Sequence, residues 1–207
     1  MNVYVETNFV LELALLQEQH QSCENILCLC ESGRANLILP AYCLAEPYET
    51  LIRRQRERKK LGTSLGNEIT QLARTSCYTR QIDVSREVVG FLVRSSDDEI
   101  NRMTNVRTRL LEIAEIISLD HIVLEAVAQH QLNYDLFPQD AIVYASVLAH
   151  LAQYKPGRSC FLNKNSKDFD DPDIRQVLEQ YNCTMLPRFD HGYQFLVNQL
   201  HFSQEAA

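Results

Sequence analysis

The sequence has 207 residues, of which 45% are hydrophobic, and its formal net charge is −7 at pH 7. This length and composition suffice for one domain with a sizeable core, and no apolar run reaches the roughly 18 residues that a membrane span requires. The acidic charge argues against a protein coated all over with nucleic acid, although it leaves room for a local basic surface.

The first residues, Met-Asn-Val-Tyr-Val-Glu, contain no basic segment ahead of an apolar stretch, so we expect no cleaved signal peptide. The seven cysteines are odd in number and form no Cys-x-x-Cys pair, which indicates reduced core residues of a cytoplasmic protein. A zinc site built on Cys28 and Cys30 is disfavoured because the usual paired spacing of zinc ligands is missing.

Short apolar strands alternate with helices along the chain. Strands are predicted at residues 2–5, 36–40, 159–162 and 183–186. The predicted helices begin near residues 7, 20, 41, 140, 172 and 190, and Thr7 or Asn8 is the expected cap of the first helix. This alternation predicts an α/β protein whose parallel sheet has helices on both faces.

The middle of the chain, residues 53–130, has an almost entirely helical pattern. Gly62 is expected to separate two helical segments, a short helix is expected around 88–92, and a longer helical stretch follows. Asp120 is then expected to cap another helix. We therefore predict a single domain, 1–207, with a helical insertion at 53–130.

Four carboxylates stand where predicted strands end or predicted helices begin: Glu6, Glu46, Asp140 and Asp168. Taken singly, each is explained equally well as a helix-terminus acid, a salt-bridge partner or part of a solvated turn. An α/β topology, however, brings all four to one edge of the sheet, where like charges repel one another unless a cation neutralises them. Carboxylate oxygens suit Mg²⁺ or Mn²⁺, so a single metal site would satisfy all four groups at once.

The residues around these carboxylates resemble the PIN-domain family. The resemblance rests on Val5–Val10, Leu39–Glu46, Gln139–Ala145 and Leu162–Phe169, which stand in the family's order. It implies a three-layer α/β/α fold around a short parallel sheet, and a ribonuclease that depends on Mg²⁺ or Mn²⁺ and leaves 5′-phosphate ends. Bacterial members are often toxins of toxin–antitoxin pairs, so the resemblance also implies an antitoxin and a homodimer as partners, with no membrane association.

The resemblance assigns the roles of metal-binding and catalytic acids to Glu6, Glu46, Asp140 and Asp168. It matches the polar positions that support these acids to Asn8, Asn163 and Asn165. The family's first acid is usually Asp, and the additional methylene of Glu6 lengthens the side chain by about 1.5 Å. Either the backbone retreats to compensate, or metal binding weakens or shifts towards Mn²⁺. The long helical insertion is a second departure from compact members of the family.

A basic run, Arg53-Arg54-Gln55-Arg56-Glu57-Arg58-Lys59-Lys60, extends the predicted helix that carries Glu46. We predict that Arg53, Arg54 and Arg56 bind RNA because the run starts near the expected site. The alternative is a solvated helix face.

The leading hypothesis is therefore metal-dependent hydrolysis of RNA phosphodiester bonds. The rival hypothesis is a catalytically weak PIN-like module that binds RNA or protein, which the presence of Glu6 in place of Asp favours. A phosphotransfer receiver or a dinucleotide-binding domain is disfavoured, because Glu6-Thr7-Asn8 and not a glycine-rich loop follows the first strand.

Overall fold

A computed structural model describes the backbone of residues 1–165, 169 and 171–205. Five strands form one parallel sheet in the order β3–β2–β1–β4–β5. The strands are β1 (Asn2–Val5), β2 (Asn36–Pro40), β3 (Glu115–Ile117), β4 (Ser159–Leu162) and β5 (Cys183–Leu186). Parallel strands need both faces covered, and β1 and β4 are accordingly apolar along almost their whole length.

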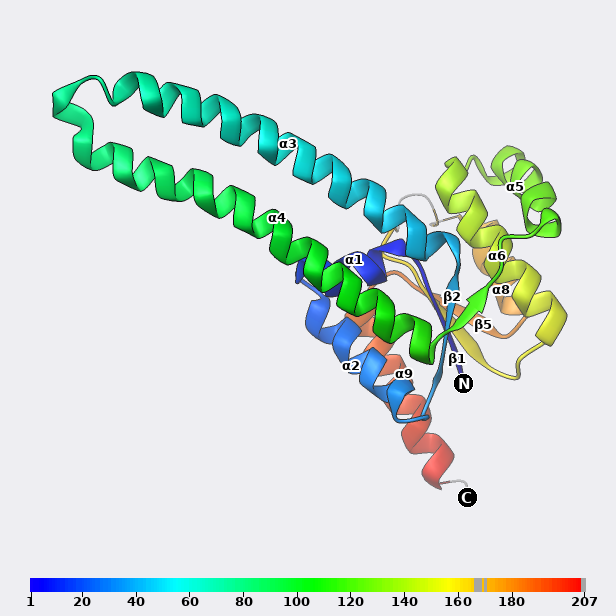
Figure 1. Cartoon of the computed structure of the whole chain (residues 1–207). Coiled ribbons are helices and arrows are strands. Elements are labelled where there is room, and N and C mark those ends of the chain that lie inside the picture. The colour runs from blue at the N-terminus through cyan, green and yellow to red at the C-terminus, as the bar shows by residue number, and fades with distance from the viewer. Residues whose placement is uncertain (166–168, 170, 206–207) are drawn as a thin grey trace.

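Helices cover both faces of this sheet, as the sequence predicted (Figure 1). The helices are α1 (Thr7–Leu15), α2 (His20–Glu31), α3 (Tyr42–Leu72), α4 (Thr79–Ile113), α5 (His121–Tyr134), α6 (Pro138–Tyr154), α8 (Pro172–Gln180) and α9 (Phe189–Glu205). One layer contains α1, α2, α9 and the base of α4, and the other contains α5, α6 and α8. The α/β fold class is therefore confirmed. None of the described helices combines the length and apolar character needed to cross a membrane.

The most prominent departure from a compact body is a hairpin of two long helices, α3 and α4, joined by the 3₁₀ turn Ser76–Tyr78 (Figure 1). At 1.5 Å per residue, α3 is about 47 Å and α4 about 53 Å long. Only the base of the hairpin rests on the sheet layers. There, Arg109 binds Glu24 and Glu31 of α2 at 2.7–3.1 Å, and Arg102 donates a hydrogen bond to the carbonyl of Ala14 at 2.8 Å.

The two helices of the hairpin meet along a seam whose residues alternate in steps of four and three, the spacing of a coiled coil. On α3 the seam positions are Leu51, Gln55, Arg58, Gly62, Leu65 and Ile69, and on α4 they are Ile82, Ser85, Val89, Leu92, Ser96, Glu99 and Met103. A polar layer interrupts the seam, because Arg58 forms a two-pronged ion pair with Glu99 at 2.9 Å for each contact. This seam explains why two sequence expectations were wrong: Gly62 does not break α3, and residues 88–92 are not a separate helix but part of α4.

Two further differences between prediction and structure are local. The strand β3 went unpredicted because its three residues directly follow α4 and continue the apolar pattern of that helix. The cap of α1 is the side chain of Glu6, which accepts a hydrogen bond from the Asn8 amide, and neither Thr7 nor Asn8 fills that role. Asp120 caps α5 as expected, since its Oδ1 accepts from the Val123 amide at 3.0 Å.

Two helical glycines should respond in opposite ways to replacement by alanine. Gly66 lies inside α3 with no atom near the position of an added Cβ, so Gly66→Ala should stabilise the protein by about 0.5–1 kcal/mol through helix propensity. Gly192 lies where α9 crosses β4, and an added Cβ would come within 2.7 Å of the fully buried Leu162 side chain. Gly192→Ala should therefore cost about 1–3 kcal/mol.

Urea denaturation of the two variants beside the wild type measures both effects. Equal stability changes of the same sign would contradict the close approach of α9 to β4.

Candidate functional site

The candidate site lies at the carboxyl ends of β1 and β4, the two neighbouring strands at which the strand order reverses direction. Ligands of open α/β sheets bind at such a point because loops diverge from it and leave a crevice. Val5 lies opposite Leu162 in the register of these strands. The next residues, Glu6 and Asn163, therefore leave the sheet side by side.

Glu6 is nearly buried, with 6% of its surface exposed, and both of its carboxylate oxygens are held by backbone amides. Oε2 accepts from Asn8 N at 2.7 Å, and Oε1 accepts from Lys164 N at 3.1 Å. Burial raises the pKa of Glu6 to about 7; the two amides oppose this rise and the nearby charge of Asp140 adds to it. The additional methylene of Glu6 is thus accommodated by a side chain that folds back onto the start of its own helix.

Glu46 reaches the same place from the second turn of α3. Its Oε2 accepts a hydrogen bond from the hydroxyl of Thr7, the residue that follows Glu6. Partial burial raises the pKa of Glu46, the Thr7 hydroxyl lowers it, and the charge of Glu49 raises it further. Thr7 therefore links the first two carboxylates, a role that the sequence did not single out.

Asp140 lies in the first turn of α6 and faces the loop that follows β4. The amide Nδ2 of Asn165 donates to both of its carboxylate oxygens at 3.3 Å. Asn163 is buried and accepts from Asn165 N at 2.7 Å through Oδ1, which fixes the loop that carries Asn165. Among the described residues, no partner exists for the buried Nδ2 of Asn163.

These groups enclose a pocket of about 320 Å³. Its lining residues are Glu6, Thr7, Asn8, Leu11, Glu46, Thr50, Phe137, Gln139, Asp140, Val143 and Asn165. The structure thus brings together the carboxylates Glu6, Glu46 and Asp140 with the predicted supporting residues Asn8 and Asn165. Asp168, the fourth predicted carboxylate, lies outside the described residues.

The described lining residues of this pocket include neither lysine nor arginine. The nearest candidate, Lys164, contributes its backbone amide to Glu6, whereas its ammonium group pairs with Glu12 of α1. Glu12 is fully buried and also accepts from Gln19 N at 2.8 Å. The ion pair therefore fastens the loop after β4 to α1, and the ammonium group of Lys164 does not pair with Glu6.

The donor set of the pocket fits a hard divalent cation, because it consists of carboxylate, amide and hydroxyl oxygens. A carboxylate also retains lone pairs after accepting one hydrogen bond per oxygen, so Glu6 can still act as a ligand. Within the described part of the chain, however, no three Asp, Glu, His or Cys groups are already placed to hold one ion together. A bound cation would require the Glu46 side chain to move relative to Thr7, or a further ligand from outside the described residues.

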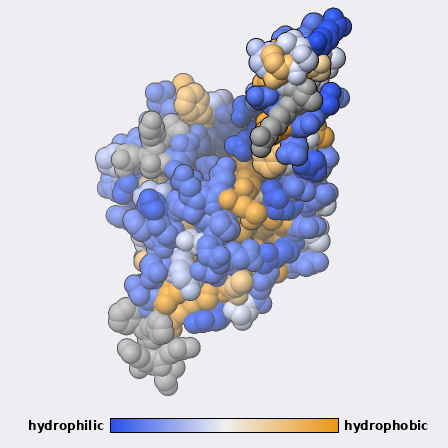
Figure 2. All heavy atoms as spheres, turned by 90° about the vertical axis from the view of Figure 1, so that its left-hand side faces the viewer, coloured by the Kyte–Doolittle hydropathy of each residue, from blue (hydrophilic) through white to orange (hydrophobic). Residues whose placement is uncertain are grey.

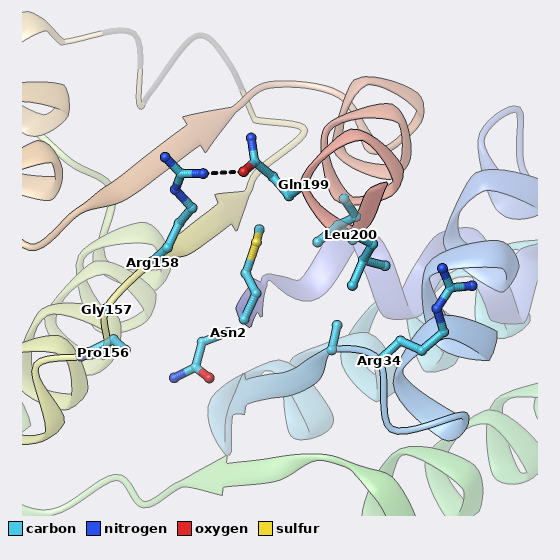
Figure 3. A pocket seen from close by; sticks show the side chains of 10 residues that line it. Asn2, Arg34, Pro156, Gly157, Arg158, Gln199 and Leu200 are labelled. Atoms are coloured by element: carbon cyan, nitrogen blue, oxygen red, sulfur yellow. Dashed lines mark hydrogen bonds between the residues drawn. The ribbon is translucent and has the colours of Figure 1, made fainter. Parts of the chain in front are cut away.

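A second pocket, of about 340 Å³, lies at the opposite edge of the sheet, near the amino ends of β1 and β4 (Figure 3). Arg34 and Arg158 border it, and Arg158 donates a hydrogen bond to Gln199 of α9. No carboxylate is among its described lining residues. It therefore lacks the groups that hydrolytic chemistry needs, and the carboxylate pocket is the candidate site.

An acidic pocket at the reversal point of a five-stranded parallel sheet defines a class of α/β protein that includes divalent-metal hydrolases. A PIN-domain family model matches residues 3–169, and the chain belongs to this family, whose members are generally nucleases that use divalent metals. No curated protein and no solved structure gives a significant match.

The raised pKa of Glu6 has a consequence for stability. Between pH 4.5, the ordinary pKa of a glutamate, and about 7, Glu6 is ionised in the unfolded chain and protonated in the folded one. Stability should therefore fall as the pH rises through this window and change no further above it. In the absence of divalent ions, Glu6→Gln should match the wild type near the lower end of the window and exceed it by about 3 kcal/mol near pH 8.

Urea denaturation at both pH values, with EDTA present, measures this difference. Glu179→Gln, the same change at an exposed position of α8, is the control and should not alter the pH dependence. An identical pH dependence for the two variants would contradict the ionisation behaviour assigned to Glu6.

Proposed function

We propose that this chain is a metal-dependent endoribonuclease that hydrolyses RNA phosphodiester bonds in the carboxylate pocket. The observation that carries the proposal is the convergence of Glu6, Glu46 and Asp140 in one pocket whose described lining residues include no cation. Three carboxylates that converge in one pocket repel one another, and a bound cation relieves that repulsion. Membership of a family of nucleases supports the same function.

Glu6 and Asp140 would hold Mg²⁺ or Mn²⁺, and Glu46 would either join them or orient a water molecule through its free oxygen. Asp168 remains the predicted fourth acid. The chemistry that such a cation supplies is a more acidic attacking water and compensation of charge on the phosphate.

The other described residues have supporting tasks. Asn165 orients the Asp140 carboxylate, and Thr7 holds Glu46 until substrate or metal competes for it. Asn163 is buried beside the pocket and holds the Asn165 amide through Oδ1, which supports the loop that carries Asn165.

The family resemblance also leads us to propose the role of toxin in a toxin–antitoxin pair, with an antitoxin protein and a second copy of the chain as partners. Growth arrest on expression of the wild type, absent for Asp140→Asn, is the measurement that tests this role. The second candidate function is a PIN-like binding module with weak catalysis. It is favoured by the engagement of both Glu6 oxygens with backbone amides, which competes with metal binding.

The substitution Asp140→Asn distinguishes a nuclease from a PIN-like module that only binds RNA. Loss of one anionic ligand should lower the rate of RNA cleavage with Mg²⁺ or Mn²⁺ at least about 100-fold, without loss of the fold. A fluorogenic RNA assay measures the rate, and Asp98→Asn, the same change at an exposed position of α4, serves as the control. Equal rates for wild type and Asp140→Asn would exclude the pocket as a nuclease site.

Phe137 offers a platform for a nucleobase at the rim of the pocket. Its side chain is 64% exposed although it lines the pocket, and it directly precedes the helix that carries Asp140. Stacking of one base on an aromatic ring contributes about 1–3 kcal/mol, so Phe137→Ala should weaken binding of single-stranded RNA about 5- to 100-fold. Fluorescence anisotropy measures the affinity. Phe91→Ala, at a position of α4 with 63% exposure, should have no effect, and equal losses in both variants would refute the platform.

A further inference from the structure

Five cationic side chains of α3 have no counter-ion among the described residues. Among the residues that the structure describes, none forms an ion pair with Arg53, Arg54, Arg56, Lys59 or Lys60. The remaining cation of this basic run, Arg58, faces the seam and binds Glu99. In a chain whose net charge is −7, this is a concentrated and unneutralised positive surface.

The direction of this surface follows from the seam. Glu46, Arg53 and Lys60 are separated by seven residues each, so a coiled-coil helix presents all three on one face. The seam positions lie on the opposite side of α3, which turns this face away from α4. Glu46 and Thr50 of the same face line the carboxylate pocket, so the basic face is continuous with the candidate site.

Helix geometry gives the spacing of these charges. Arg53 lies about 10 Å and Lys60 about 21 Å along the helix from Glu46. At 3.4 Å per phosphate of a stacked strand, the longer distance corresponds to about six nucleotides. Arg56 lies three residues from Arg53 and four from Lys60, and these three side chains form one contiguous cluster.

The cluster continues into an open depression of about 590 Å³ on α3. The residues that line it are Arg56, Lys59, Lys60, Thr63, Ser64 and Asn67. Cations interspersed with hydroxyl and amide groups are the side chains that contact nucleic-acid phosphates. The depression contains no carboxylate among its described lining residues. One acid of this face, the exposed Glu57, lies between Arg53 and Lys60 and is outnumbered by the cations around it.

We propose that this outward face of α3, from Arg53 to Asn67, binds the phosphate backbone of an RNA strand that extends from the carboxylate pocket along the hairpin. The proposal rests on the proposed ribonuclease function, because it takes the pocket as the place where the strand begins. It extends the predicted RNA contacts at Arg53, Arg54 and Arg56 to Lys60. Arg58 is not among the proposed contacts, because its guanidinium pairs with Glu99 in the seam.

The hairpin also presents apolar side chains, which suit a protein surface better than RNA. Val84, Val88 and Phe91 lie on one face of α4 and are 51–63% exposed. Figure 2, in which the hairpin points towards the viewer, shows such apolar residues at its projecting end among strongly hydrophilic ones. These three residues lie on α4 and are separated from the carboxylate pocket. The basic face of α3 adjoins the pocket, so we assign the basic face to RNA.

The test removes two charges from the basic face and two from elsewhere on the hairpin. Arg53→Gln with Lys60→Gln is compared with Arg86→Gln with Arg94→Gln, two exposed positions of α4. All proteins carry Asp140→Asn and are kept free of divalent ions, so that binding is measured without cleavage. The probe is a fluorescent single-stranded RNA of about twenty nucleotides, long enough to reach Lys60 from the pocket, titrated at several salt concentrations.

Loss of two phosphate contacts should weaken binding roughly tenfold and reduce the slope of log affinity against log salt by about 1.4. The α4 control should retain the slope of the parent protein. Equal slopes for the two variants would overturn the proposal. A parent protein that binds no RNA but self-associates through its hairpin would overturn it as well.

Cleavage of a dinucleotide by the wild type separates this proposal from the proposed function. A dinucleotide occupies the pocket and cannot reach the basic face. If the dinucleotide is cleaved while the salt slopes of the two double variants are equal, the nuclease function is supported and RNA binding by the α3 face is refuted. If no RNA is cleaved while the salt slopes differ as expected, RNA binding by the α3 face is supported and the nuclease function is refuted.

Discussion

Val5 lies opposite Leu162 in the parallel pair of β1 and β4, and this register places Glu6 beside the loop that carries Asn163, Lys164 and Asn165. A shift by one residue would turn the buried side chains of either strand to the opposite face of the sheet, so the core fixes the register strongly. Because the register is fixed, Glu6 and Asn163 emerge as neighbours, and the amide of Lys164 reaches the Glu6 carboxylate. The geometry of the candidate site therefore follows in part from the packing of apolar strands.

The electrostatics of the site leave the buried Glu6 without the nearest described lysine. Lys164 gives its ammonium group to the buried Glu12, although its backbone amide binds Glu6. Glu6 is left with amide dipoles alone and keeps a pKa near neutrality. A site that sacrifices stability in this way is typical of functional regions, where local rules of folding are broken for the sake of ligand binding.

Sequence patterns predicted the sheet better than the hairpin. The strands 2–5, 36–40, 159–162 and 183–186 appear with the predicted bounds, because short apolar runs between turn signals have few alternatives. Gly62 was expected to end a helix because glycine weakens isolated helices, whereas the seam stabilises α3 through it. Tertiary packing therefore overrode local propensity in the hairpin.

The candidate site was predictable to the extent that it depends on strand ends. Glu6, Glu46 and Asp140 could be named because each follows a recognisable element and bears a charge beside apolar residues. Thr7 and Phe137 could not, because a hydroxyl that binds a carboxylate, or a phenyl ring at a rim, leaves no pattern in the sequence. Their roles arise only when α1, α3 and α6 are brought together.

The seam of the hairpin repeats every seven residues, so the length of the hairpin can change while the residues of the candidate site stay the same. Inserting seven residues into each helix would preserve the order of facing positions and leave the body of the domain untouched. The tip would move outwards by about 10 Å, while residues added at this interval would stay in line with Glu46. The ion pair of Arg58 with Glu99 would fix the register of the two helices. The hairpin can therefore become longer or shorter in steps of seven residues per helix while the sheet and its pocket keep their structure.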